Sequence, residues 1–419
     1  MYIVNIDCKI NVLKDERFMT AQEAAAALGV ATQTLYAYAS RGMLRSESVP
    51  GQPRTRRYFR EDVDRLVERK EVRRSPEKAS PRSLNWGNPV LDSAITLIEA
   101  GRLYYRGHDA VELARSATVE EVAALLWTGA TDRSAEIFAP SDGAVLAQSA
   151  RTVERIAGLG AIERCQMVLP LAGLRDQRAY DLRPGPAAFT GARILRLLAV
   201  VAGSGVRAAD SPIDSILQTA WALHKPAARV SLRAALILCA DHELNVSAFT
   251  ARCAASAGST PYDVVAAGLA ALKGKHHGGH TAQVEALLNE IGKPARARDI
   301  VAAKMRQAER LPGFGHRLYP GGDPRAKLLI SLATSAARGQ AASLVNALTE
   351  AGREIMREHP NLDFGLAALA HVLRLPPGSA LAIFALGRSI GWIAHAIEQY
   401  GSNQLIRPRA RYVGPDAID

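Results

Sequence analysis

The stretch LPGFGHRLYPGGDPR at residues 311–325 decides how this chain is interpreted. It places His316 among glycines, which let the backbone approach a ligand closely. A lone histidine in such a turn is usually structural, but Asp323-Pro324-Arg325 follows within the same stretch. Arginine offers a planar fork that pairs with a carboxylate through two hydrogen bonds. Taken alone, Arg325 could equally form a surface ion pair.

Four further segments of the second half carry chemically active side chains. Together with the first stretch they supply one well-placed carboxylate, three imidazoles and several arginines, which is what a site needs to make a carbanion equivalent and hold a polyanionic acceptor. The four segments are Asp241-His242-Glu243-Leu244-Asn245, His276-His277-Gly278-Gly279-His280, Asn361-Leu362-Asp363-Phe364 and Arg407-Pro408-Arg409.

Carbon–carbon bond formation from a thioester requires a base for a weakly acidic methyl group, a donor for the enolate oxygen and an acid for the ketone. Asp363 is the natural base, since Asn361 is expected to cap a helix and to place Asp363 in its first turn. Taken alone, Asp363 would only complement the helix dipole. His277 precedes a predicted helix N-terminus, where an imidazole stays neutral and can donate to an enolate oxygen.

A metal is not expected at the histidine segment. Gly278 and Gly279 disfavour a helical pair of ligands among His276, His277 and His280, and no carboxylate sits at a zincin-like position.

The order and the residues of these segments resemble citrate synthase over about residues 90 to 419. Tyr105-Arg106-Gly107 and Leu126-Trp127 match the opening of the bacterial enzymes. The resemblance implies that His277, His316 and Asp363 are catalytic, and that acyl-coenzyme A is a substrate with no further cofactor. It also implies ligands for oxaloacetate at His242, Arg325, Arg388 and Arg407, and contacts with coenzyme A at Gly313, Phe314, Gly315 and Arg317.

The resemblance further implies an all-α architecture and a homodimer in which Arg407 reaches the neighbouring site. The large domain would comprise residues 86–277 and 378–419, and the small domain residues 278–377. Three residues near the chemistry depart from the usual pattern, namely His276, His280 and Gly365. Because a hydrophobic pocket separates acetyl from propionyl by only about 1 to 3 kcal/mol, a 2-methylcitrate synthase is an alternative to the acetyl-specific enzyme.

Composition agrees with a helical protein. The chain has 419 residues, 48% of them hydrophobic and only 5% aromatic, with abundant alanine and leucine. We expect helices that include one at 111–127, and a short hairpin at 95–107. Four scattered cysteines, a first segment without a signal-like apolar core and no long uncharged run favour a cytoplasmic protein.

The N-terminal 72 residues are expected to form a separate unit that resembles a MerR-type winged helix-turn-helix, joined to the rest by a Lys/Arg/Pro/Ser-rich linker at 73–85. Thr20 and Glu23 form a predicted capping box ahead of an alanine-rich helix. A basic stretch follows the second helix, within a chain of net charge +11. The residues expected to meet DNA are Gln33, Thr34, Tyr36, Arg54, Arg56 and Arg57.

Two other interpretations stay open at this level. The N-terminal module could serve docking or dimerisation without binding DNA. The whole chain could be a regulator that senses coenzyme A thioesters or dicarboxylates without turnover, although such a sensor would need the arginines and not the base Asp363.

Overall fold

The computed structural model describes residues 18–49, 52–64, 66–67, 91–140, 148–152, 155, 158–203, 211–410 and 412–415, without the side chains of 52–54. The chain divides into two compact units, Met1–Asp92 and Ser93–Asp419. The predicted linker at 73–85 lies outside the described residues. Each unit is described by itself.

The smaller unit is a helix-turn-helix with a three-stranded antiparallel sheet. Its elements are β1 (Phe18–Thr20), α1 (Ala21–Leu28), α2 (Thr32–Ser40), β2 (Ser46–Val49) and β3 (Gln52–Phe59), with the strands in the order β1-β3-β2. Residues 60–64 are helical. The predicted capping box at the start of α1 is confirmed, because Thr20 and Glu23 bond to each other's backbone amides. Gly29 turns the chain in the left-handed conformation between the two helices.

A small apolar core holds this unit together. It is formed by Met19, Ala24, Ala25, Leu28, Leu35, Leu44, Tyr58 and Val63. The core therefore joins both helices, the sheet and the helical residues after it.

The larger unit is mostly helical, with one three-stranded sheet of β4 (Thr96–Glu99), β5 (Arg102–Tyr105) and β6 (His108–Asp109). The first group of helices is α5 (Ala110–Ser116), α6 (Val119–Thr128), α7 (Ser134–Ile137), α9 (Ala161–Gly173), η1 (Gln177–Tyr180), α10 (Pro184–Ala202), α11 (Ile213–Ala220), α12 (Pro226–Cys239), α13 (Val246–Ser256) and α14 (Pro261–Leu272). The second group is α15 (His280–Ile291), η2 (Pro294–Arg296), α16 (Ala297–Arg306), α17 (Pro324–Ala336), α18 (Gln340–Ala351), η3 (Gly352–Met356), α19 (Leu362–Leu373) and α20 (Ser379–Ser402).

One predicted helix is wrong in its extent. The segment 111–127 forms two helices, α5 and α6, because Thr118 accepts the amide of Glu121 while the Glu121 side chain accepts the amide of Thr118. This capping box starts a new helix and ends the old one. The predicted hairpin is confirmed by the pairing of β4 with β5.

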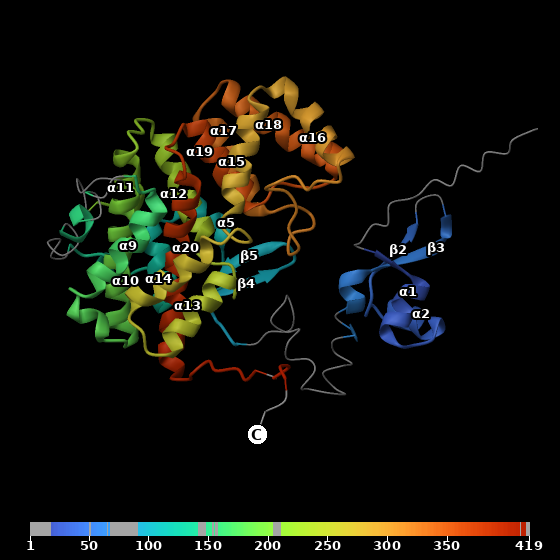
Figure 1. Ribbon diagram of the computed structural model, residues 1–419, viewed down its shortest axis with the longest axis horizontal. Coiled ribbons are helices and arrows are strands. Elements are labelled where there is room, and N and C mark those ends of the chain that lie inside the picture. The colour runs from blue at the N-terminus through green and yellow to red at the C-terminus, as the bar shows by residue number, and fades with distance from the viewer. Residues whose placement is uncertain are drawn as a thin grey trace, which may run out of the picture. The chain divides into compact units, whose positions relative to one another are not determined.

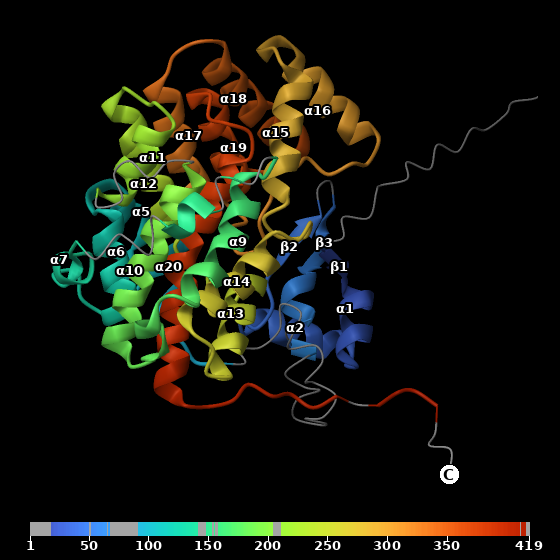
Figure 2. The same ribbon diagram turned by 60° about the vertical axis from the view of Figure 1, so that its left-hand side comes forward.

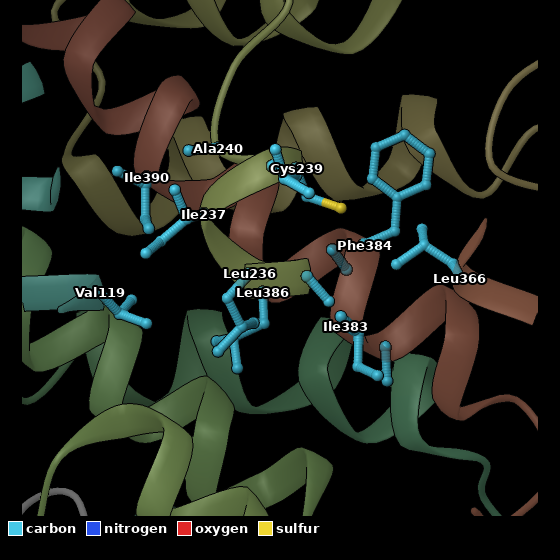
Figure 3. Close-up of a cluster of buried hydrophobic side chains, with 14 of the residues drawn as sticks. Val119, Leu236, Ile237, Cys239, Ala240, Leu366, Ile383, Phe384, Leu386 and Ile390 are labelled. Carbon is cyan, nitrogen blue, oxygen red and sulfur yellow. The ribbon is translucent and has the colours of Figure 1, made fainter. Parts of the chain in front are cut away.

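Helix α20 runs through the middle of the larger unit and packs against α10, α12, α13 and α14 (Figures 1 and 2). Glycines allow its backbone to approach α12 closely: a Cβ at Gly387 would lie 2.5 Å from the carbonyl oxygen of Leu236 and 2.7 Å from Cβ of Cys239. Figure 3 shows the apolar side chains of α12 and α20 in the same cluster, among them Ile237, Ile383 and Ile390. Close packing in this cluster holds α12 and α20 rigidly together, and these helices support the polar residues of the site described below.

Two helices, α10 and α20, are long and apolar enough to cross a membrane by length and composition. The most apolar windows of these helices are 83% and 94% buried inside the protein. They are therefore the core helices of this fold.

Candidate active site

Five helices bring the predicted chemical groups together. The N-terminal ends of α13, α15, α17 and α19 and the middle of α20 carry or adjoin His242, His277, Arg325, Asp363 and Arg388. Helix N-termini present unpaired N–H groups and partial positive charge, which suits anionic ligands. The charges of Arg325 and Arg388 both act on the carboxyl group of Asp363.

Asp363 lies in the first turn of α19. Asn361 caps that helix, as predicted, because its side chain accepts the amides of Asp363 and Phe364. Oδ1 of Asp363 is buried and has no hydrogen-bond partner among the described residues. Burial raises the pKa of Asp363 to about 7, against the opposing fields of Arg325 and Arg388. A carboxyl group with such a pKa can take up and release a proton near neutral pH.

The loop that carries His316 is tied to the segment before Asp363. The amide of Gly315 donates to the His359 carbonyl at 2.8 Å, and the amide of Asn361 donates to the Gly313 carbonyl at 2.8 Å. Gly313 has φ +80° and no room for a side chain, since a Cβ there would lie 2.6 Å from Val284. The two chemical groups therefore belong to one hydrogen-bonded frame.

His316 is held neutral in one tautomer. Burial and the charge of Arg325 lower its pKa to about 4. The amide of Leu318 donates to Nδ1 at 3.2 Å, so the ring proton of the neutral form lies on Nε2. His316 can therefore donate a hydrogen bond through Nε2 to a carbonyl oxygen.

His277 lies three residues before the start of α15, in agreement with the sequence prediction. Burial lowers its pKa to about 4, with smaller contributions from the charges of Arg388 and His280. Its Nε2 lies 2.8 Å from Oγ of Ser247, and that hydroxyl lies 2.8 Å from Oδ1 of Asn245. The Ser247 hydroxyl can donate its proton either to Oδ1 of Asn245 or to Nε2 of His277. Which of the two accepts it determines the tautomer of His277.

His242 is a neutral imidazole beside an aromatic ring. Burial, Arg325 and Arg388 hold its pKa well below the usual value. Its Nε2 lies 3.0 Å from the hydroxyl of Tyr319, and its ring centroid lies 5.3 Å from that of His316. His242 and His316 are therefore brought into one aromatic group.

Arg325 is buried and paired. Its Nε and NH2 groups donate to the two oxygens of Asp323 at 3.0 and 2.8 Å, and the same carboxylate accepts the amide of Leu362 at 3.1 Å. The Asp323 carboxylate raises the pKa of Arg325 against the effect of burial. One carboxylate therefore fixes both the arginine and the beginning of the helix that carries Asp363.

Arg388 is also buried, at 2% exposure, but makes no ion pair with any described residue. Its Nε donates to the Cys239 carbonyl at 2.7 Å, and its guanidinium lies over the Phe384 ring. Burial lowers the pKa of this arginine, while the charge of Asp241 acts in the opposite direction. A buried cation without a paired carboxylate is costly, and an anionic ligand would offset that cost.

Some predicted site residues lie apart from this group. Arg407 is exposed on the segment after α20, which extends away from the helices in Figures 1 and 2. Phe314 is buried, with its ring centroid 5.0 Å from that of Phe364, and Arg317 is exposed. Phe314 is thus part of the hydrophobic core.

The three unusual residues have different settings. His276 is exposed, and His280 is the half-buried first residue of α15. Gly365 is buried where α17 and α19 pack, since a Cβ there would lie 3.2 Å from Cα of Ala326. Close helix packing therefore accounts for the glycine at 365. Within the described part of the chain, no group of three potential metal-ligating side chains is found.

Four residues of the site were not singled out from the sequence. They are Asp241, Ser247, Tyr319 and Asp323. Ser247, Tyr319 and Asp323 form hydrogen bonds with predicted site residues, and the charge of Asp241 acts on Arg388. Asp241 is fully buried, and its Oδ1 lies 3.2 Å from Nε2 of His395. All four lie inside or next to the quoted segments, so position near a motif was the available signal.

Comparison with known proteins agrees with this geometry. Residues 84–409 match the model of the citrate synthase C-terminal domain. The chain belongs to the citrate synthase family. Residues 18–71 match a helix-turn-helix domain. The resemblance to citrate synthase and the N-terminal helix-turn-helix, which were both expected from the sequence, are confirmed.

Individual citrate synthases are similar along most of the chain. Citrate synthase 2 of Bacillus subtilis (strain 168) is 33% identical over 77% of this chain and 93% of its own. A 2-methylcitrate synthase of Mycobacterium tuberculosis (strain ATCC 25618 / H37Rv) is 30% identical over 75% of this chain and 86% of its own. The crystal structure of citrate synthase from Thermotoga maritima MSB8 superposes with a TM-score of 0.66 and 27% identity, covering 80% and 96% of the two chains. The protein is a citrate synthase-like enzyme.

The residues of the helix-turn-helix unit that were predicted to contact DNA differ in their exposure. Gln33 and Tyr36 are exposed on α2, whereas Thr34 is half-buried. Arg57 pairs with Glu47 and lies over the Phe18 ring. Arg56 is exposed and donates to Oγ of Ser46 at 3.0 Å, and the side chain of Arg54 lies outside the described residues.

Proposed function

We propose that this protein condenses acetyl-coenzyme A with oxaloacetate to give citrate and coenzyme A. The observation that carries the proposal is the buried Arg388, which pairs with no carboxylate among the described residues, beside Arg325 and His242 and next to the carboxyl group of Asp363. Two arginines suit a dicarboxylate acceptor, and Asp363 suits the removal of a proton from a thioester methyl group.

The first step forms the nucleophile. Ionised Asp363 takes a proton from the methyl group of the thioester, and the electron pair of that C–H bond moves to form the enolate. When Ser247 donates to Nε2 of His277, the proton of the neutral ring lies on Nδ1 and can be donated to the enolate oxygen. A neutral donor with a pKa of about 4 remains available for this role throughout the neutral range.

The second step forms the carbon–carbon bond. The enolate carbon attacks the keto carbon of oxaloacetate while His316 donates through Nε2 to the oxygen that gains charge. Arg325 and Arg388 hold the acceptor's carboxylates. Water then cleaves the thioester of citryl-coenzyme A, releasing citrate and coenzyme A. These steps draw only on side chains of this chain, the two substrates and water.

The choice of acyl group is the finer part of the proposal. Relatives of similar identity include both citrate and 2-methylcitrate synthases. We propose acetyl as the preferred group and propionyl as the alternative, which would add one methylene to the same pocket.

A thiol-release assay tests the function. Purified protein is mixed with oxaloacetate and acetyl- or propionyl-coenzyme A, beside an Asp363→Ala variant and an Asp132→Ala control at an exposed aspartate. Turnover that is lost only in Asp363→Ala supports the proposal and reports the acyl preference. Wild-type protein that binds oxaloacetate but releases no thiol with either thioester would contradict it.

We also propose that the active unit is a homodimer in which Arg407 completes the partner's site. Mixing Asp363→Ala with Arg407→Ala protein tests this idea. In a mixed dimer one site keeps both residues, so random exchange of subunits should restore about a quarter of wild-type activity. A mixture no more active than its components would contradict the shared site.

For the N-terminal unit we propose duplex DNA as the partner, with α2 presenting Gln33 and Tyr36 and the hairpin presenting Arg56. Fluorescence anisotropy with labelled duplex DNA at several salt concentrations tests the surface. Arg56→Ala should weaken binding across sequences and reduce the salt slope by about 1, as expected for one lost phosphate contact. An unchanged slope would remove Arg56 from the interface.

A further inference from the structure

Tyr319 is a buried side chain at the centre of the proposed acceptor site. Its amide donates to the His316 carbonyl at 3.1 Å, and its own carbonyl accepts the amide of Gly322 at 2.9 Å. Its exposed fraction is 2%. Two consecutive turns therefore fix the residue between the His316 loop and α17.

One ring touches three of the proposed site residues. The centroid of the Tyr319 ring lies 4.9 Å from that of His316 and 5.7 Å from that of His242. The guanidinium carbon of Arg325 lies 5.3 Å from the same centroid, within the range of a cation–π contact. The tyrosine therefore contacts both histidines and Arg325 through a single ring.

The hydroxyl of Tyr319 has one partner among the described residues, namely Nε2 of His242 at 3.0 Å. Burial raises the pKa of Tyr319 to about 12, so the phenol keeps its proton at neutral pH. If His242 were the donor, that phenol proton would have no acceptor in the described part of the chain. The arrangement that satisfies both groups has Tyr319 donating to a bare Nε2.

This direction of donation decides the tautomer of His242. The ring is neutral, and with Nε2 bare its one proton lies on Nδ1. Nδ1–H is then the single donor that His242 offers an anionic ligand.

We propose that Tyr319 is a positioning residue of the acceptor pocket, which orders His242 through its hydroxyl and Arg325 through its ring before a dicarboxylate binds. The inference rests on the proposed function, since it names how that site recognises its keto acid.

The test separates the hydroxyl from the ring. Tyr319→Phe keeps the ring against His316 and Arg325 and removes only the bond to His242. Tyr400→Phe is a matched control, because the Tyr400 hydroxyl also donates one hydrogen bond, to the Ser259 carbonyl at 2.6 Å. Among the described residues, this hydroxyl forms no hydrogen bond with a proposed site residue. Oxaloacetate binding to the full-length proteins is measured by titration calorimetry, and the Michaelis constants of both substrates are measured in parallel.

We expect Tyr319→Phe to weaken oxaloacetate binding about fivefold, the factor for one net hydrogen bond. The Michaelis constant of the thioester and the melting temperature should follow those of Tyr400→Phe. Unchanged oxaloacetate binding in Tyr319→Phe would overturn the inference and leave the proposed function standing. Wild-type protein that neither binds oxaloacetate nor turns over would overturn both.

A second readout needs no ligand. Nitrogen NMR of the histidine rings, with His242 assigned from a His242→Gln variant, should show the Nδ1–H tautomer in the wild type and a mixture of tautomers in Tyr319→Phe. A wild-type His242 with its proton on Nε2 would overturn the inference directly.

Discussion

Replacing Asp363 by asparagine should stabilise the protein at pH 8 while abolishing turnover. The folded carboxyl has a pKa of about 7, against an ordinary value of 3.8. Between these values the folded state holds a proton that the unfolded chain has released, so this group makes the fold less stable as pH rises from about 4 to 7. Asparagine has nearly the same shape and no charge to bury.

The size of the effect follows from the shift. A difference of about three pKa units corresponds to about 4 kcal/mol, and partial exposure of Asp363 reduces the expected gain to about 2 kcal/mol. The full gain is present above pH 7. At pH 5 only the first third of the interval has been crossed, so the gain should be about a third as large.

Urea unfolding at pH 5 and pH 8 measures this difference. The chain has four tryptophans and none lies in residues 18–71, so their fluorescence does not report on the helix-turn-helix fold. Asp132→Asn, at an exposed position, is the control and should leave the midpoint unchanged at both pH values. An equal gain at pH 5 and pH 8, or a less stable Asp363→Asn protein at pH 8, would refute the assignment of a buried carboxylate.

Three further results are expected. The kcat/KM of the wild type should rise with pH through about 7 as Asp363 loses its proton, and a limb centred near pH 4 would contradict the burial of that group. Ser247→Ala should lower kcat about tenfold with little change in the oxaloacetate Michaelis constant, because His277 loses its partner; steady-state kinetics decide. Gly391→Ala should cost about 1 to 3 kcal/mol in urea unfolding, since its Cβ would lie 2.5 Å from Asp241, whereas Gly401→Ala meets nothing and should be neutral or stabilising.

Features that depend on neighbours along the chain could be predicted from the sequence. The caps at Thr20 and Asn361 are examples, because a cap needs only a side chain and the amides two or three residues later. The break between α5 and α6 has the same kind of signal at Thr118 and Glu121, but it was overridden by the apolar spacing on either side. Where the two local patterns disagree, the capping box determines the helix boundary.

Contacts between distant segments left no local signal. Ser247 meets His277 30 residues later, and Tyr319 meets His242 77 residues earlier. Neither polar pair has a spacing or a composition that marks it. The histidines and arginines of the site could be proposed because they resemble a family pattern, whereas the groups that hold them needed the folded structure.

The carboxylate of Asp323 binds Arg325 through two bonds and the first amide of α19 through a third. Recognition of the acceptor by Arg325 and the position of the base Asp363 thus depend on the same anchor, the Asp323 carboxylate. An evolutionary change that relaxed this anchor to admit a bulkier keto acid would also displace Asp363. Diversification of acceptor preference in this lineage should therefore proceed through residues outside the anchor, and the acyl side of the pocket is free to vary without that penalty.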